Sequence, residues 1–345
     1  MLLELTDKQW RPFKIGDNFH VSKGTYLSKK QILKGLNPYV TASASNNGIT
    51  DFIGNKTLFP SNMITIEKVK LSAFYQPVSF YCSHDVSVVS HQKLNKLSGL
   101  FISSMINRQG QKYSYGRQAQ LNVVKRETAF MPVDLEGEPD WLFMQGYTKA
   151  LMDKKKAKYI EFCRKELAKL KPKNIVKLED KEWHEFFLKD IFKIVQRGKR
   201  LTKANQIEGH NPYVSSTSLN NGVNDFIGNE DSVRIFSNCL TVANSGSVGA
   251  SFYQPYKFVA SDHVTHLQND QFDRFIYLFI ATLTNRLSDK YNFNREINDK
   301  RISRDKVMLP VNEDHLPDFE YMGQYMMNQE YLKRKQYLNY NQSEK

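Results

Sequence analysis

The stretch PDWLFMQGYTKALMDKKKAKYIEFCRKELAKL, residues 139–170, determines how this chain is organised. After Pro139 it contains no proline, and Gly146 is its only glycine, so little in it interrupts a helix. Asp140 can accept hydrogen bonds from backbone N–H groups that the first helical turn leaves unpaired. The spacing therefore predicts one helix of roughly 45 Å, at about 1.5 Å per residue.

Apolar residues in this stretch recur at steps of three and four, which places them on one face of a helix. One stripe consists of Met144, Tyr147 and Leu151, and a later one of Ala157, Ile160, Cys163, Leu167 and Leu170. The opening of the stretch returns near the C-terminus as Pro317, Asp318, Phe319, Met322 and Tyr325. We therefore expect a long helix to close each half of the chain.

The remainder of the chain is repeated as well. Trp10, Phe13, Asp17 and Phe19 return in the same order as Trp183, Phe186, Asp190 and Phe192. Asn-Pro-Tyr-Val occurs at 37–40 and at 211–214, and Asn-Asn-Gly occurs at 46–48 and at 220–222. The match runs through the whole module, which chance does not produce. The chain is therefore a duplication.

The fold class that this pattern predicts is α+β, a strand-rich globule followed by a long helix, present twice. Short β-branched runs between Asn-Gly, Gly-Asn and Ser-Asn turns predict strands at 63–66, 86–89, 240–243 and 257–260. Helical spacing appears at 97–108 and 272–286. The expected domains are a globule at 1–138, a helix at 139–171, a linker at 172–181, a globule at 182–316 and a helix at 317–345.

The charge of the chain indicates an acidic partner. A formal net charge of +13 most often accompanies nucleic-acid binding, although a generic basic surface is the alternative. Cys82, Cys163 and Cys239 are widely spaced and odd in number, so they predict no disulfide framework and fit a reducing compartment. No signal-peptide pattern and no run of about 18 apolar residues is present, so we expect a cytoplasmic protein without a membrane span.

Three patterns resemble catalytic motifs, and each has a plainer interpretation. Asn-Pro-Tyr-Val is a shortened form of the Asn-Pro-Pro-Tyr motif of adenine methyltransferases, but a loop entering a strand explains it better. Pro139-Asp140 with Glu179-Asp180-Lys181 resembles a nuclease metal site, yet the second module has no such triplet. His84-Asp85 and Asp262-His263 have no third ligand at metal spacing, which favours hydrogen-bonded structural pairs. We expect no metal site and no catalytic residues.

Binding chemistry is concentrated in loops instead. Lysine and arginine neutralise phosphates, and polar side chains on turns can contact base edges. Basic residues and a threonine gather in glycine-containing loops near the start of each module: Lys23, Thr25, Lys29, Arg197, Lys199, Arg200 and Lys203. A second basic and aromatic group consists of Lys112, Tyr115, Arg117, Lys290, Tyr291, Phe293 and Arg295.

Asparagine and serine side chains complete the candidate set. Asn46, Asn47, Asn220 and Asn221 suit contact with adenine, and a turn role fits them equally well. Ser245 and Ser247 belong to a glycine-containing turn, 244–249, whose backbone can approach DNA closely. A solvated surface is the alternative for every one of these residues.

The repeat organisation and the Trp-x-x-Phe entries resemble the specificity subunits of type I and related type IIB restriction-modification systems. In the second module, Leu240–Ala243, Gly246–Gly249 and Ser261-Asp262-His263 look like the target-recognition-domain pattern of that family. Glu67-Lys68-Val69-Lys70 replaces the Gly-Ser-x-Gly turn in the first module. The resemblance implies two target-recognition domains that read one interrupted DNA target, with the two helices packed as an antiparallel coiled-coil spacer.

The same resemblance implies a division of labour. Partner methyltransferase subunits, with a restriction subunit or as a fused methyltransferase–nuclease, would carry S-adenosylmethionine, Mg²⁺ and the catalytic residues, and this chain would hold no cofactor. Two other functions fit the sequence less well: a divergent DNA methyltransferase or nuclease that acts alone, and a scaffold whose basic face binds an acidic protein.

Overall fold

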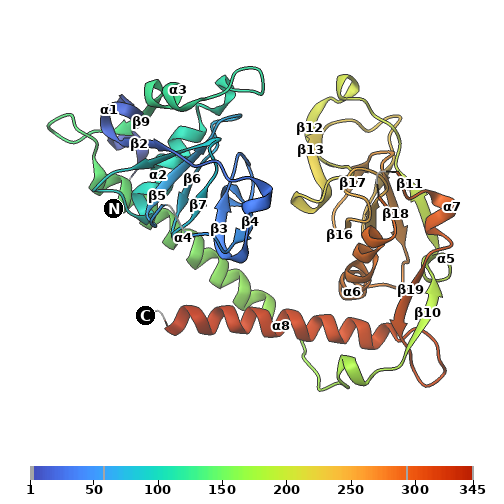
Figure 1. Cartoon of the computed structure of the whole chain (residues 1–345). Coiled ribbons are helices and arrows are strands. Elements are labelled where there is room, and N and C mark those ends of the chain that lie inside the picture. The colour runs from blue at the N-terminus through green and yellow to red at the C-terminus, as the bar shows by residue number, and fades with distance from the viewer. Residues whose placement is uncertain (1–3, 57–58, 293, 344–345) are drawn as a thin grey trace. The chain divides into compact units, whose positions relative to one another are not determined.

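The chain forms two compact units, residues 1–159 and 160–345. The computed structural model (Figure 1) describes residues 4–56, 59–292 and 294–343. Both units have the same order of elements, apart from one added short strand, β14 (Ile235–Phe236), in unit 2, which confirms the duplication and the α+β class.

Unit 1 contains the first globule and most of the first long helix. Its elements are β1 (Trp10–Lys14), α1 (Ile15–Asn18), β2 (His20–Lys23), β3 (Lys34–Val40), β4 (Ile49–Ile53), β5 (Met63–Glu67), β6 (Ala73–Gln76), β7 (Tyr81–Cys82), β8 (Val86–Ser90), α2 (Lys96–Asn107), α3 (Leu121–Arg126), β9 (Thr128–Pro132) and α4 (Trp141–Leu167). The last residues of α4, from Ile160, belong to unit 2.

Unit 2 repeats this series. Its elements are β10 (Trp183–Phe187), α5 (Leu188–Ile191), β11 (Ile194–Arg197), β12 (Glu208–Val214), β13 (Val223–Ile227), β14 (Ile235–Phe236), β15 (Cys239–Ala243), β16 (Ser251–Gln254), β17 (Phe258–Ala260), β18 (Val264–Gln268), α6 (Arg274–Thr284), α7 (Asp299–Ile302), β19 (Lys306–Pro310) and α8 (Phe319–Ser343).

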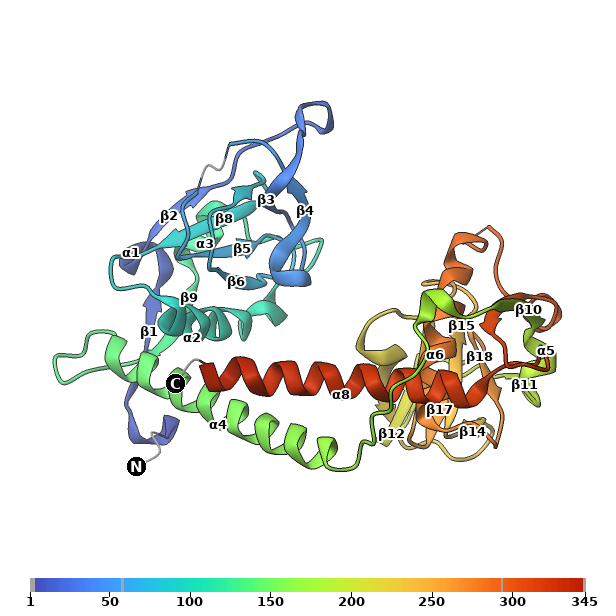
Figure 2. The ribbon, with the colours of Figure 1, turned by 90° about the horizontal axis from the view of Figure 1, so that it is seen from below.

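The sheets of the two units have matching strand orders. Unit 1 has a sheet β2-β8-β5-β6, a sheet β4-β3-β7 and the pair β1-β9. Unit 2 has β11-β18-β15-β16, β13-β12-β17-β14 and the pair β10-β19. In each unit one helix lies along the first of these sheets, α2 in unit 1 (Figure 2) and α6 in unit 2. The predicted strands and helical patches therefore lie where the sequence indicated, to within about two residues.

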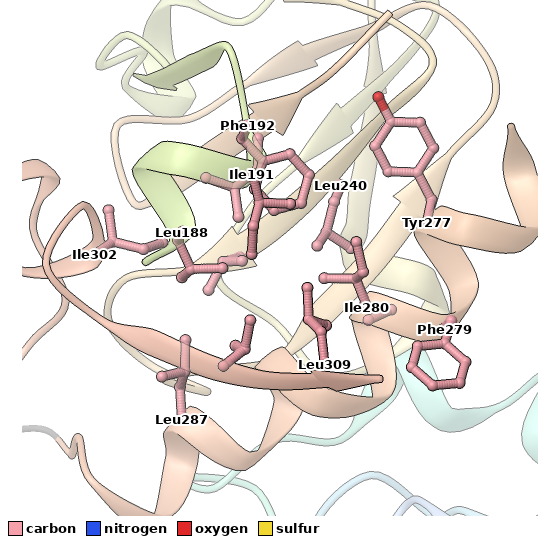
Figure 3. Close-up of a cluster of buried hydrophobic side chains, with 14 of the residues drawn as sticks. Leu188, Ile191, Phe192, Leu240, Tyr277, Phe279, Ile280, Leu287, Ile302 and Leu309 are labelled. Carbon is pink, nitrogen blue, oxygen red and sulfur yellow. The ribbon is translucent and has the colours of Figure 1, made fainter. Parts of the chain in front are cut away.

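The core of each globule lies between this sheet and its helix. In unit 2 it contains Leu240 from β15, Leu309 from β19, and Tyr277 and Ile280 from α6 (Figure 3). The core of unit 1 is built in the same way, with Ile64, Ile66 and Val89 from the sheet and Ile102 from α2. Burial of these apolar surfaces is the main stabilising term of each unit.

The two long helices begin in the same way. The Asp140 carboxylate accepts the backbone N–H of Phe143 at 2.8 Å and the Lys8 ammonium at 2.5 Å. At the start of α8, the Asp318 carboxylate accepts the backbone N–H of Tyr321 at 3.0 Å and the Lys181 ammonium at 2.8 Å. The predicted capping role of Asp140 is confirmed, and in each copy the cap is also an ion pair.

The predicted apolar stripes of α4 are covered to different degrees. Met144 and Cys163 are buried, whereas Ala157 and Leu151 are exposed. Within unit 2, the guanidinium of Arg334 on α8 lies 3.8 Å from the Cys163 sulfur and 4.9 Å from the centre of the Phe162 ring. The end of α4 therefore contacts α8, and an antiparallel coiled coil along the full helices stays a prediction.

The predicted linker is an ordered strap along α8. Asn328 accepts the backbone N–H of Lys173 at 3.1 Å and donates its amide to the Lys173 carbonyl at 2.7 Å. The Tyr321 hydroxyl donates to the Val176 carbonyl at 3.0 Å. Side chains of α8 thus form hydrogen bonds with the backbone of this segment.

The Asn-Pro-Tyr-Val segments lie inside strands, so the expectation of a loop entering a strand is wrong. In β3, a bulge separates Lys34 from Asn37, and Pro38 then pairs with Phe52 of β4. The Asn37 amide donates to the Asn55 carbonyl at 2.6 Å, and Tyr39 is buried against Tyr81. Because neither side chain is free to hold an extruded base, this geometry does not support methyltransferase chemistry here.

Removing the Asp140 cap is expected to weaken unit 1. Burial favours the neutral acid, but the hydrogen bonds from Lys8 and from the backbone N–H groups of Phe143 and Leu142 outweigh it and hold the pKa of Asp140 below its usual value. Asp140→Ala should lower the free energy of unfolding by about 1–2 kcal/mol at neutral pH. The measurement is urea denaturation of the full chain.

Acidification provides a second readout of the same cap. A carboxylate with a lowered folded-state pKa contributes stability above its unfolded pKa, and this stability is lost as pH falls through the folded value. The gap between wild type and Asp140→Ala should therefore close below about pH 4. Asp153→Ala, which removes an exposed ion pair with Lys149 on the same helix, should have a much smaller effect. An equal loss in both variants would contradict the capping role.

Candidate DNA interface

Strand register brings the candidate loops of each unit to one edge of its sheet. In unit 1, Lys23 of β2 lies opposite Ser87 of β8, which lies opposite Ile66 of β5. In unit 2, Arg197 of β11 lies opposite Thr265 of β18, which lies opposite Val242 of β15. We call this edge the loop edge. It comprises segments 23–29, 67–72 and 83–86 in unit 1, and 197–203, 244–250 and 261–264 in unit 2.

Hydrogen bonds join the loop edge of unit 2 to two further segments. The Arg197 guanidinium donates to the Ile297 carbonyl at 3.0 Å, and the Ile297 N–H donates to the Asn244 carbonyl at 3.0 Å. The Ser247 N–H donates to the Ser216 carbonyl at 3.1 Å. The predicted residues Arg197, Ser245 and Ser247 and the 290–298 segment are therefore brought together.

A serine–histidine contact also lies in the loop edge of unit 2. The Ser245 hydroxyl and Nδ1 of His263 are 2.8 Å apart, which fixes the 244–250 turn against the 261–264 turn. Nε2 of His263 lies 3.9 Å from the Asp262 carboxylate, too far for the hydrogen bond that orients the base of a catalytic triad. Ser245 is buried, so we assign the contact a positioning role.

Unit 1 closes the corresponding turn with a carboxylate in place of glycines. The buried Glu67 accepts the backbone N–H groups of Val69 and Lys70 at 2.6 Å each, and that of Ser72 at 3.1 Å. These bonds hold Leu71 at φ +58°, where unit 2 has Gly249 at φ +86°. The first module therefore keeps the turn although it lacks the Gly-Ser-x-Gly sequence, and a carboxylate closes the turn instead.

Two of the predicted contact residues serve the fold instead. Tyr291 is only 3% exposed and donates its hydroxyl to Asp305 at 2.7 Å, so its side chain cannot reach DNA in this conformation. Lys112 forms an ion pair at 2.9 Å with Glu127, which is 8% exposed. The sequence predicted that this aromatic and basic run forms one exposed surface. The lysine and the tyrosine that begin the run in each unit instead contact a buried carboxylate.

The pKa values of this buried group reflect the same contacts. Burial, and then the hydrogen bond to Glu127, raises the pKa of Tyr113 to about 12. Burial would raise the pKa of Glu127, but hydrogen bonds from Tyr113, the Thr128 N–H and Lys112 hold it below its usual value. Glu127 is therefore an ionised anchor at neutral pH.

The tips of the same segments remain available for contact. Tyr115 is 84% exposed and lies with Arg117 in a tight turn that the Ser114–Arg117 bridge closes. Arg295 occupies the corresponding place in unit 2, next to Asn292, and Phe293 lies outside the described residues. An exposed aromatic ring beside a guanidinium suits stacking on bases together with a phosphate contact.

The remaining candidates divide between exposed cations and turn asparagines. The exposed cations are Lys23, Lys29, Lys199, Arg200 and Lys203, with Thr25 beside them, and Lys203 also forms an ion pair with Asp225. Asn46 and Asn220 are exposed. The amides of Asn47 and Asn221 donate to Gln76 and Gln254 at 3.1 Å, and both residues have positive φ, which supports the turn role.

Sequence reasoning missed two cations at the loop edge. Lys68 forms an ion pair at 2.7 Å with Asp85. The sequence had indicated only His84 as a partner of Asp85, and Nε2 of His84 lies 3.3 Å from the same carboxylate. Arg234 donates to the Arg197 carbonyl at 2.6 Å from a part of the chain far from the loop. Lys68 could have been found from its place in the turn that replaces the glycines, whereas nothing in the sequence indicates Arg234.

Comparison with known proteins identifies the family. Residues 7–161 and 180–336 each match the family described as the type I restriction modification DNA specificity domain. The chain belongs to this family and carries two specificity domains. The interpretation of the repeat as a specificity subunit of a restriction-modification system is confirmed.

Two named relatives resemble the chain over most of its length. The type II restriction enzyme BgcI specificity subunit S.BcgI of Heyndrickxia coagulans is 29% identical over 331 residues, which cover 93% of this chain and 95% of the relative. A putative type I specificity subunit, S.MpnORF507P of Mycoplasma pneumoniae, is 27% identical over 266 residues, covering 73% and 71%.

Solved structures of S subunits also match. That of the type I restriction-modification S subunit from M. genitalium matches with a TM-score of 0.46 and 18% identity, over 99% of this chain and 94% of that one. That of HsdS from Thermoanaerobacter tengcongensis matches with a TM-score of 0.34 and 14% identity, over 95% and 91%. Among the described residues of the present chain, no helix is long and apolar enough to cross a membrane.

Lys112→Met separates the structural from the DNA-binding interpretation of Lys112. The variant leaves the buried Glu127 without its cation, so the free energy of unfolding should fall. We expect a loss of about 1–2 kcal/mol, a value already reduced for solvent screening because the Lys112 side chain is 46% exposed. The exposed Arg117→Met is the matched control, expected to leave stability unchanged and to weaken DNA binding. If Lys112→Met leaves the free energy of unfolding unchanged, Lys112 is again a candidate for contact with DNA.

Proposed function

We propose that this chain reads a two-part, interrupted DNA target, with one half-site for each specificity domain. The supporting observation is that two copies of one scaffold present the same loop edge with different side chains. Glu67 closes the turn in unit 1 and Lys68 follows it, where unit 2 has Ser245 and Gly246. Because the two scaffolds are alike and the side chains at their loop edges differ, the two units suit two different half-sites.

The chemistry of the loop edge fits duplex DNA. Exposed Lys23, Lys29, Lys199 and Arg200 supply cations for phosphates, which set position without reading sequence. Sequence readout is assigned to the two tips, with Tyr115 and Arg117 in unit 1 and Arg295 in unit 2, and to the turns beside them. The formal net charge of +13 favours the association over long range.

We further propose that catalysis belongs to partner subunits. Burial raises the pKa of the Cys82 thiol, and that of Cys239 to about 12, so neither is a reactive thiolate at neutral pH. Methyltransferase subunits would bind S-adenosylmethionine, and a restriction subunit or a fused methyltransferase–nuclease would use Mg²⁺. The relatives, each named as a specificity subunit, support this division.

The long helices are the proposed docking surface for those partners. On the unit 1 part of α4, Leu142 is 81% exposed and Leu151 is 42% exposed. Leu151 also lines a surface hollow of about 320 Å³ together with Leu5, Tyr147 and Ala150. Exposed apolar side chains beside a hollow are typical of a protein-binding surface.

DNA binding by the purified chain should be sequence-specific and salt-dependent. Selection from a random duplex library should enrich two short motifs at a fixed spacing. Affinity should fall with salt at a log–log slope of about −0.9 for each neutralised phosphate, and Lys23→Ala or Lys199→Ala should reduce the steepness by about 1. Lys155→Ala on α4 is the matched control, expected to leave the slope unchanged. Salt-independent binding, or selection of no motif, would refute the proposal.

Partner docking should depend on the exposed leucines of α4. Leu142→Glu with Leu151→Glu is expected to abolish copurification with the methyltransferase subunit, because each places a charge in an apolar contact. The DNA affinity of the isolated variant should equal that of wild type, which reports that the fold is intact. Leu142 and Leu151 lie nine residues apart, on opposite sides of α4, so full copurification of this double variant would rule out both leucines as docking contacts.

A further inference from the structure

A group of two histidines and one glutamate lies in unit 2, away from the loop edge. One ligand atom each from Glu182, His184 and His315 lies within 4.8 Å of the others, and this is the one such group of three among residues 4–56, 59–292 and 294–343. Oε1 of Glu182 is 2.7 Å from Nε2 of His184 and 3.7 Å from Nδ1 of His315. The two imidazole rings are stacked with centroids 5.1 Å apart.

The backbone holds these three residues on two adjacent segments. Glu182 and His184 are two residues apart at the start of β10, a spacing that places side chains on one face of a strand. The Glu182 carbonyl accepts the N–H of Val311, where the turn before α8 begins. Within that turn the Asn312 side chain accepts the N–H groups of Asp314 at 3.1 Å and Leu316 at 3.0 Å, which fixes the position of His315.

His315 adopts a backbone conformation that favours glycine. Its φ is +58°, and the corresponding residue of unit 1 is Gly137 with φ +85°. A side chain in this region is strained, and such strain is concentrated at functional positions. The turn itself does not require histidine, because the unit 1 copy is closed in the same way by Asp134, which accepts the N–H groups of Glu136 and Glu138.

Unit 1 carries non-chelating residues at all three positions. Its counterparts are Gln9, Arg11 and Gly137, as the register shows: Trp10 pairs with Pro132 just as Trp183 pairs with Pro310. A Cβ added at Gly137 would lie 2.5 Å from a guanidinium nitrogen of Arg11, so the same two segments touch in both units. The difference between the units is therefore one of ligand chemistry on a shared backbone.

We propose that Glu182, His184 and His315 bind one divalent transition-metal ion of the Zn²⁺ class. Two imidazole nitrogens and a carboxylate oxygen are ligands that zinc prefers, and water can complete a tetrahedral shell. The side chains are 59%, 39% and 63% exposed, which leaves them room to close to bond lengths of about 2.0–2.2 Å. The nitrogen of His184 that binds the metal must carry no proton, so metal coordination replaces the hydrogen bond between Nε2 of His184 and Glu182.

The proposed ion stabilises the beginning of the globule of unit 2. It links β10, which follows the strap along α8, to the turn that leads into α8. The site is independent of the proposed DNA contacts and of partner docking. Cys82, Cys163 and Cys239 are buried and so do not compete for added metal.

The test is zinc binding by the untagged full chain after treatment with a chelator. Titration calorimetry with ZnCl₂ should show one ion per chain, and thermal denaturation should show a higher midpoint with zinc, because a ligand of the folded state stabilises it. The triple variant Glu182→Gln, His184→Arg, His315→Gly installs the residues of unit 1. Its affinity should fall by more than about 100-fold, since even outer-shell partners of a zinc site are worth about 10–100-fold.

Controls distinguish this site from adventitious zinc binding. His20→Gln removes an exposed histidine of unit 1 and should retain full zinc binding. His184→Arg alone should lose the zinc-dependent rise in the denaturation midpoint while its circular dichroism spectrum stays that of wild type. Wild-type protein that binds no zinc, or a triple variant that binds it as well as wild type does, would overturn the proposal.

Discussion

Antiparallel register in the central sheet is the constraint on which the rest of this structure depends. Because Lys23, Ser87 and Ile66 lie side by side across three strands, the loops adjoining them emerge at one edge. The same register recurs at Arg197, Thr265 and Val242. A slip of one residue would turn every side chain of the slipped strand to the opposite face, so core packing and loop placement are fixed together.

Duplication kept this scaffold and changed the residues at its edges. Both copies keep the capping aspartate with its lysine, and both keep a tyrosine and a lysine on one buried carboxylate. The turns differ: Glu67 provides in unit 1 the closure that glycines provide in unit 2. The turn before the long helix differs as well, with Gly137 in one copy and His315 in the other. Conserved packing beside variable loops suits a family that reads different DNA sequences with one fold.

Sequence alone predicted the features that depend on local pattern. Helical spacing identified α4 and α8, and β-branched runs between turn residues identified β5, β8 and β15. It failed where distant contacts decide. Tyr291 is buried and donates its hydroxyl to Asp305, and Lys112 is paired with Glu127. The Asn-Pro-Tyr-Val strand was missed because proline is unfavourable inside a strand, whereas here Pro38 pairs with Phe52 between two irregularities of register.

The central claim, that each copy reads its own half-site, is tested most directly by replacing residues 180–336 with a second copy of 7–161 and selecting targets from a random duplex library. If each unit reads independently through its loop edge, this chain selects the unit 1 half-site twice and loses the unit 2 half-site. If the folded chimaera still selects the two different wild-type half-sites, sequence readout lies outside the exchanged segments and the account is wrong.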